Sequence, residues 1–447
     1  MTNNDNSASA FQLDIDLRRA GYAADASHAV IEALVRLRAP AKPANAKPRE
    51  PLTLALVIDR SGSMSGAPLA EAKRCARTIV QSLGPADRAA VIVFDDEVER
   101  LCGVIGSDQR TALLAAIDAI DSGGATDLHG GWVEGARALG QDMASAGTHR
   151  VILLSDGAAN RGETDLETIC ASCRDLAKQG ISTSTYGLGT RFNEDLMLAM
   201  AKAGRGNAYY GQTAQDLAEP FHDEFALLTS LCARGMVLKV NAPRGVQVTL
   251  RNDYECAEGE ALAWKLPDLA FAAQAWAYLK IVVPHVFLDA PTVSLPITLS
   301  IKAAGPGSTP LFFMASLPPI ERMTRAALMS LPPHPEVEGR REELAAGDTL
   351  ELVRRLIAHA RWDAASAAVE KAQQRFAANP WCKGILDTMR RLISRRDAFA
   401  AKEATYASAV MRRRLAARDE RGLHFDHADI PAFLRRKTEQ GKGRRPE

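Results

Sequence analysis

Short apolar runs recur along the middle of the chain, and each is followed by a segment with helical spacing. The runs at 52–59, 89–95 and 149–157 are almost continuously apolar, which is typical of strands buried on both faces of a sheet. The segments between them repeat apolar residues at the spacing of amphipathic helices, and the last such helix is expected at 213–230. This alternation predicts a doubly wound, Rossmann-like α/β domain with a parallel sheet over residues 52–230.

The pattern changes on both sides of this domain. Residues 233–317 lose the helical spacing and contain strand-like runs separated by Gly, Pro or Asp, which predicts an antiparallel β-sandwich. These runs are few for a closed sandwich, so the strand-like runs within 11–38 are expected to pair with it and complete it. The α/β domain would then be inserted into the sandwich, after a linker at 39–51 that is rich in Pro, Ala and Lys.

The rest of the chain is predicted to be helical or irregular. Residues 337–421 are rich in helix formers with an apolar face, and a proline-rich connector at 318–336 precedes them. The polar ends, 1–10 and 422–447, are expected to be disordered tails. The predicted fold class is therefore multidomain, with an α/β domain, a β-sandwich and a helical C-terminal region.

Composition and charge narrow the class of protein. Of the 447 residues, 47% are hydrophobic and 24% are charged, which is an ordinary globular profile. The formal net charge of +1 gives no basic excess, so nucleic acid is not the favoured partner. No apolar run is long enough to cross a membrane, and the polar N-terminus resembles no secretory signal. Seven cysteines at scattered spacing are interpreted as reduced thiols, and a cytoplasmic protein is predicted.

The candidate chemistry lies at the ends of the predicted strands. Asp59-Arg60-Ser61-Gly62-Ser63 follows the first buried strand, Thr126 lies in a glycine-rich loop, and Asp156 follows a later strand. In an open parallel sheet, ligands bind at the carboxyl ends of the strands, so these segments are expected to meet there. Two carboxylates and three hydroxyls are hard oxygen ligands that suit Mg²⁺ or Mn²⁺. The predicted metal ligands are Asp59, Ser61, Ser63, Thr126 and Asp156.

This ordered set resembles a von Willebrand factor type A (VWA) domain with an intact metal-ion-dependent adhesion site. The family pattern is Asp-x-Ser-x-Ser, a distant Thr and a later Asp-Gly, and all of its side chains occur here in order. The resemblance implies direct coordination by Ser61, Ser63 and Thr126, with Asp59 and Asp156 acting partly through bound waters. It also implies one open metal position that a carboxylate of a partner protein fills.

Neighbouring residues are expected to shape this site. Asp127 is interpreted as a group that caps the loop or supports the ligands, rather than as a direct ligand. Arg60, Met64 and His129 are expected to form the rim that a partner contacts. A carboxylate of the C-terminal tail, such as Asp426, is a further candidate for the open metal position.

The leading functional prediction is a metal-dependent protein-interaction module without enzymatic activity. The arrangement resembles bacterial cytosolic VWA proteins, which implies an adaptor that binds an Asp or Glu of a partner in an intracellular complex. The resemblance also implies that this partner is linked to a MoxR-type AAA ATPase, with a stress or defence context.

Two other functional classes stay open from the sequence. A Mg²⁺-dependent hydrolase needs a general base, for which His129 is the candidate, and the sequence has no Walker lysine motif. An RNA-binding scaffold would use the basic C-terminal helices, although a solvated helix face is the simpler interpretation of their arginines. The Cys170-x-x-Cys173 pair is interpreted as core packing on one helix face rather than as half of a zinc site.

Overall fold

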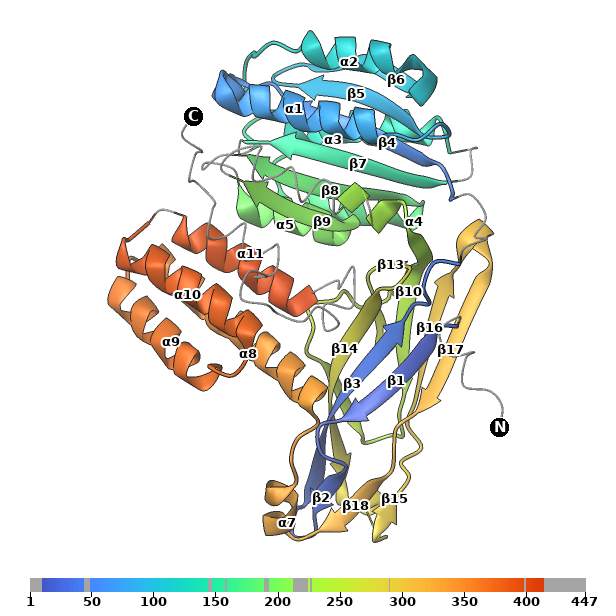
Figure 1. Ribbon diagram of the computed structural model, residues 1–447, viewed down its shortest axis with the longest axis vertical. Coiled ribbons are helices and arrows are strands. Elements are labelled where there is room, and N and C mark those ends of the chain that lie inside the picture. The colour runs from blue at the N-terminus through green and yellow to red at the C-terminus, as the bar shows by residue number, and fades with distance from the viewer. Residues whose placement is uncertain are drawn as a thin grey trace. The chain divides into compact units, whose positions relative to one another are not determined.

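The computed structural model describes residues 10–43, 49–143, 147–156, 159–188, 193–211, 224–225, 227–288, 290–397 and 399–413 (Figure 1). The chain divides into two compact units. The α/β unit contains the described residues between 49 and 229, and the sandwich–helix unit contains the described residues before 47 and from 230 onward. The predicted helix at 213–230 lies mostly outside the described residues, as do the predicted C-terminal tail and Asp426.

The α/β unit is built on a six-stranded sheet with the order β6-β5-β4-β7-β8-β9 and with helices on both faces (Figure 1). Strand β4, at Leu52–Asp59, is buried along its whole length and pairs in parallel with both of its neighbours. The remaining elements are β5 (Arg88–Phe94), β6 (Val98–Gly106), β7 (Thr148–Ser155), β8 (Ile181–Leu188), β9 (Arg205–Gly211), α1 (Ala67–Ser82), α2 (Arg110–Asp118), α3 (Leu128–Gly140), α4 (Leu166–Lys178) and α5 (Glu194–Ala203).

The sheet is mixed, which corrects the prediction of a parallel sheet. Strand β6 runs antiparallel to β5 at one edge, and strand β9 lies at the other edge. The sequence pattern indicated neither strand, because both are half-exposed and lack the continuous apolar run of a buried strand. Three of the inner strands, β4, β5 and β7, are buried almost throughout and were predicted from the apolar runs at 52–59, 89–95 and 149–157.

The sandwich–helix unit contains two antiparallel sheets. The first has the order β1-β3-β14-β11, with β1 at Gln12–Leu17, β3 at His28–Arg38, β14 at Gln274–Pro284 and β11 at Gln247–Leu250. Strand β3 pairs with β14 from one end to the other, so segments on either side of the α/β unit share one sheet. The second sheet contains β12 (Ala263–Lys265), β10 (Leu231–Asn241), β16 (Thr298–Ala304) and β17 (Pro310–Ser316), with β13 (Leu269–Ala270) beside β10.

The region predicted as a proline-rich connector, 318–336, contains regular structure. Strand β18, at Ile320–Met323, pairs in parallel with β2 (Gly21–Ala23) and antiparallel with β15 (Thr292–Val293). Helix α7, at Arg325–Ser330, follows it. These strands have two to four residues each, which is too short for a periodic signal in the sequence.

Four longer helices follow: α8 (Pro335–Ala358), α9 (Trp362–Arg375), α10 (Pro380–Ser394) and α11 (Ala400–Arg413). Helix α8 packs on the first sheet of the sandwich, where Val337 and Leu344 join Leu34, Trp276 and Tyr278 in one buried cluster. All seven cysteines are free thiols, and Cys170 and Cys173 are buried on one face of α4. Within the described ranges, no helix combines the length and apolar character needed to cross a membrane.

Candidate metal centre

The loop after β4 places Asp59, Ser61 and Ser63 at the carboxyl edge of the sheet. The chain turns sharply after Asp59, and the backbone N–H of Ser61 donates to Asp59 Oδ1 at 2.8 Å. A short 3₁₀ turn at Gly62–Met64 then carries Ser63. Asp59 and Ser61 are almost completely buried, so their oxygens are held inside the edge of the sheet rather than on its surface.

Strand β7 brings the second carboxylate to the same place. Because β4 and β7 are parallel neighbours in register, Ser155 and Asp156 lie beside the end of β4. Ser63 Oγ donates to Asp156 Oδ1 at 2.8 Å, and the hydroxyl oxygens of Ser61 and Ser63 are 3.2 Å apart. The structure therefore joins four of the five predicted ligands, Asp59, Ser61, Ser63 and Asp156, through a short chain of hydrogen bonds.

The fifth predicted ligand, Thr126, lies in a loop that is bound to the β4 loop through the backbone. Gly62 N donates to Gly124 O at 2.9 Å, and Gly123 N donates to Arg60 O at 2.6 Å. Thr126 is 3% exposed. Asn160 fixes its backbone, because Asn160 Oδ1 accepts from Thr126 N at 2.9 Å while Asn160 N donates to Thr126 O at 3.2 Å.

Asp95, at the end of β5, holds these two loops together. Its carboxylate accepts hydrogen bonds from Gly124 N and from Arg60 Nε, each at 3.2 Å, and from Glu97 N at 2.9 Å. Burial raises the pKa of Asp95, but the two backbone donors and Arg60 outweigh it, so the pKa is lowered. A Cβ on Gly123 would lie 1.8 Å from Asp95 Oδ2, so this loop requires glycine for the close approach.

The electrostatics of Asp59 differ from those of Asp95. Burial raises the pKa of Asp59 to about 6, and the charge of Asp156 adds to the rise, while hydrogen bonds from Ser155 and Ser61 lower it. These donors are neutral: besides Ser61 N, the hydroxyl of Ser155 donates to Asp59 Oδ2 at 2.5 Å. A buried carboxylate that neutral groups hold beside a second carboxylate is a setting that a cation would stabilise.

The donor set fits a hard divalent cation. Its oxygens come from hydroxyls and two carboxylates, which are the ligand types that Mg²⁺ and Mn²⁺ prefer. Among the described residues, no cluster of three or more His, Cys, Asp or Glu side chains could hold a metal ion, and the candidate site itself combines only two carboxylates with hydroxyls.

Of the three residues predicted for the rim, Arg60 and His129 are half-buried and Met64 is fully buried. Arg60 is partly exposed and pairs with Asp95 and with Glu99, the latter at 3.0 Å. His129 stacks on Trp132 with ring centroids 5.8 Å apart, and burial lowers its pKa. The prediction that Met64 belongs to the rim is wrong, because the 3₁₀ turn directs this side chain inward and it is fully buried.

Asp127 lies at the N-terminus of α3 and acts there as a cap. Its side chain accepts from Gly130 N at 2.9 Å, which satisfies one of the free N–H groups of the first helical turn. Its own N–H donates to Asp95 O at 2.8 Å. Asp127 therefore fixes the direction in which the chain leaves Thr126.

Two supporting residues, Ser155 and Asn160, were not identified from the sequence, and a third, Asp95, was interpreted as a turn residue near the rim of the site. Ser155 directly precedes Asp156, and Asp95 ends a buried strand, so their positions at the carboxyl edge could be inferred from the strand pattern. From the sequence alone, Asp95 looks like an ordinary turn residue at the end of a strand. Its contacts with Arg60 and Gly124 cannot be predicted locally, because these residues belong to loops far away in the chain. Nothing in the sequence near Asn160 indicates that it binds the backbone of Thr126.

Comparison with known proteins identifies the α/β unit. Residues 53–223 match the von Willebrand factor type A domain, so the chain contains a VWA domain. An uncharacterized protein of Synechocystis is 25% identical over 224 residues, which are 49% of this chain and 52% of that protein. The uncharacterized protein YfbK of Escherichia coli is 25% identical over 42% of this chain and 33% of its own length. The chain thus matches about half or less of the length of these relatives.

Solved structures with the same overall fold extend beyond the VWA domain. A von Willebrand factor type A protein from Catenulispora acidiphila superposes with a TM-score of 0.70 at 15% identity, over 92% of this chain and 98% of that one. The ArnB paralog VWA2 from Sulfolobus acidocaldarius gives a TM-score of 0.60 at 16% identity, over 90% and 98% of the two chains. At these identities the likeness shows a shared fold that includes the sandwich and helices.

Proposed function

We propose that the carboxyl edge of the VWA domain holds Mg²⁺ or Mn²⁺. In this proposal, Ser61, Ser63 and Thr126 coordinate the ion directly, while Asp59 and Asp156 act through bound waters and orient the hydroxyls. The observation that carries it is the hydrogen-bonded chain from Asp59 to Asp156 through the two serines. Asp59 supports it further, because it is buried among neutral donors.

The function that this site supports best is metal-dependent binding of a partner protein. VWA domains are generally metal-dependent interaction modules and are usually not catalytic. When bound, the cation would offer an open position to a carboxylate, and in that dehydrated setting the attraction is stronger than in water. Arg60 and the backbone of the Thr126 loop would then surround an Asp or Glu of the partner.

The finer expectations belong to the same proposal. We infer an adaptor role in a multiprotein complex, and a MoxR-type AAA ATPase is the partner class to test first. A hydrolase is less well supported, because the ring of His129 is stacked on Trp132 and its Nε2 is buried without a hydrogen-bond partner in the described structure.

The first experiment measures metal binding directly. Titration of the full chain with MnCl₂, followed by calorimetry, should give saturable binding that Asp156→Ala abolishes. Asp175→Ala removes an exposed aspartate from α4 and serves as the matched control, so it should bind Mn²⁺ as the wild type does. Equal Mn²⁺ affinity in wild type and Asp156→Ala would contradict the proposed ligand set.

The second experiment measures partner binding. The tagged chain is incubated with a purified MoxR-type ATPase or with cell lysate, in MgCl₂ or in EDTA. Recovery of a partner only with wild type and Mg²⁺ is the expected outcome. Equal recovery with EDTA or with Asp156→Ala would place partner binding outside the metal centre.

A further inference from the structure

A pocket of about 480 Å³ lies within the sandwich–helix unit, apart from the metal centre. Residues of β3 and β14 form one wall, and residues of α8 and the end of α9 form the other. This volume falls in the range of sites for small molecules, which are roughly 300–1,000 Å³.

The pocket carries an excess of positive charge. Its lining includes four cationic side chains, Arg251, Lys280, Arg341 and Arg375, against two acidic ones, Glu32 and Asp348. The formal net charge of the lining is therefore +2. Neither Lys280 nor Arg375 forms an ion pair with any residue that the structure describes, and Arg375 instead lies over the ring of Phe376.

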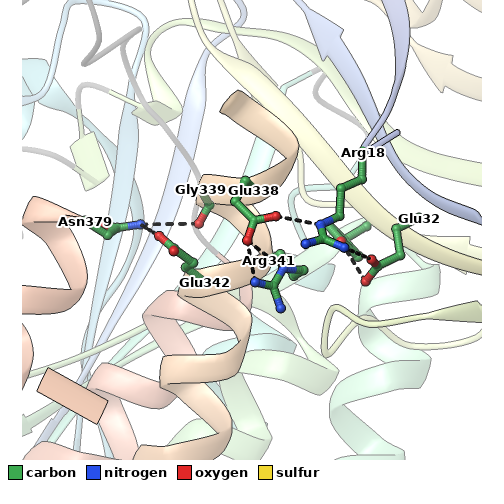
Figure 2. Close-up of polar contacts among 8 residues, drawn as sticks. Arg18, Glu32, Glu338, Gly339, Arg341, Glu342 and Asn379 are labelled. Atoms are coloured by element: carbon green, nitrogen blue, oxygen red, sulfur yellow. Dashed lines mark hydrogen bonds and ion pairs between the residues drawn. The ribbon is translucent and has the colours of Figure 1, made fainter. Parts of the chain in front are cut away.

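The acidic side chains of this region are already engaged by other groups. Arg18 Nη1 binds Glu32 Oε2 at 3.1 Å, and the hydroxyl of Tyr278 donates to Glu32 Oε1 at 3.0 Å. Arg18 also binds Glu338 at 2.6 Å, and Arg341 binds the other oxygen of Glu338, as Figure 2 shows. Burial raises the pKa of Glu338, but the two arginines outweigh it and lower the pKa to about 2.

The other acidic residue of the lining, Asp348, is engaged in the same way. Asp348 binds Arg251 at 3.0 Å and Arg412 at 2.8 Å. The carboxylates are thus neutralised by arginines, two of which, Arg18 and Arg412, lie outside the lining. Lys280 and Arg375 are left as the cations available to a ligand.

The wall provided by α8 is partly apolar. Leu344 and Leu352 both line the pocket; Leu344 is buried, and Leu352 is 44% exposed. Such a wall can hold the carbon part of a ligand while the cations bind its charged group.

We infer that this pocket binds a small phosphomonoester. A phosphomonoester carries a charge of about −2 at neutral pH, which matches the net charge of the lining. Lys280 and Arg375 bind the phosphate oxygens, because lysine and arginine both make strong charge-assisted hydrogen bonds to phosphate. The site belongs to the sandwich–helix unit and is independent of the proposed metal centre.

The test is a titration of the full chain with glycerol 3-phosphate, followed by calorimetry at constant ionic strength and in EDTA. Glycerol serves as the neutral analogue and should show no binding. Lys280→Gln and Arg375→Gln should each weaken binding about tenfold or more, since each loses a hydrogen bond to a charged group. Arg390→Gln removes an exposed cation from α10, outside the pocket, and should bind as the wild type does.

Several results would overturn the inference. If glycerol 3-phosphate does not bind, or if glycerol binds equally well, the pocket does not recognise the phosphate group. Equal weakening in Lys280→Gln and Arg390→Gln would show a general charge effect. A phosphoserine peptide that binds at least about tenfold more tightly than glycerol 3-phosphate would replace the small ligand with a protein one. Melting curves of each variant confirm that the titrated protein is folded.

Discussion

The central strand of the VWA domain, β4, meets a buried aspartate at each end, and the two carboxylates are held in different ways. At the amino end, Asp87 accepts hydrogen bonds from Leu52 N at 2.9 Å, Gly84 N at 2.7 Å and Arg49 Nη1 at 2.6 Å. At the carboxyl end, Asp59 accepts from Ser61 N and from the Ser155 hydroxyl. Both aspartates are fully buried, but only Asp87 has a cation beside it.

The pKa values follow this difference. Burial raises the pKa of Asp87, but Arg49 and the two backbone donors outweigh it, so its pKa is lowered. Burial raises the pKa of Asp59 to about 6, and its neutral donors offset only part of that rise. The protein therefore neutralises the buried carboxylate at the amino end of the strand with its own arginine, whereas the buried carboxylate at the carboxyl end has only neutral donors among the described residues.

The largest expected effect is at the amino end. Asp87→Ala leaves Arg49 and two backbone N–H groups without their acceptor, so the free energy of unfolding should fall by about 3 kcal/mol. Urea unfolding of the full chain measures this loss. Asp118→Ala breaks the exposed pair with Arg77 and should lose less than about 1 kcal/mol. If both variants lose a similar free energy of unfolding, the buried aspartate Asp87 contributes no more to stability than the exposed Asp118, which would contradict the prediction.

The carboxyl end should respond in the opposite direction. Asp59→Asn removes a buried charge, so in EDTA its free energy of unfolding should rise by about 1–2 kcal/mol at neutral pH. In MgCl₂ the wild type should gain stability while Asp59→Asn should not, because bound ligand stabilises the folded state. Melting temperatures in the two buffers measure both effects. A wild type that is more stable than Asp59→Asn in EDTA would contradict the comparison.

A smaller effect is expected for a residue that supports the metal centre without binding the ion. Asn160→Ala removes the acceptor for Thr126 N, so the Thr126 loop loses one of the hydrogen bonds that hold it in place. Mn²⁺ affinity should fall about tenfold while melting in EDTA changes little, as is typical of residues that orient ligands. Unchanged Mn²⁺ affinity would show that the loop is held without Asn160.

The smallest expected effect is on the free energy of unfolding at acid pH. Since the pKa of Asp87 is lowered in the folded state, its contribution is fully present above its ordinary pKa of 3.8. This contribution is lost as the pH falls below that value. The stability difference between wild type and Asp87→Asn should therefore shrink by about 1 kcal/mol between pH 5 and pH 3, as measured by urea midpoints. A difference that is constant with pH would exclude this charge as its source.

The sequence was most informative where burial was complete. Strands such as β4 and β7 have unbroken apolar runs, so they were predicted together with the polar residues that follow them. The half-exposed edge strands β6 and β9 have no such run, and the sheet was therefore predicted without its antiparallel strand. The apolar pattern of one segment indicates how deeply that segment is buried, but it does not indicate which strands lie beside it or in which direction they run.

The same distinction holds at the candidate metal centre. The positions of Asp59 and Asp156 follow from the ends of two neighbouring parallel strands, which the pattern indicated. The roles of Asp95 and Asn160 depend on the approach of loops that are far apart in the chain, and no local signal contains that information. Met64 was misplaced because its position next to Ser63 does not reveal the direction of its side chain.

The pairing of β3 with β14 has a consequence for the synthesis of the chain. Strand β3 ends at Arg38 and its partner β14 begins at Gln274, so the whole VWA domain is translated between them. At roughly 5–20 residues per second, β3 waits on the order of tens of seconds for its partner. During that time β1 can already pair with one edge of this 11-residue strand, but the edge that belongs to β14 is unpaired, which makes it a target for a chaperone or for aggregation. The described VWA domain is one contiguous stretch of chain, so it can fold during the wait, before β14 is available to complete the sandwich.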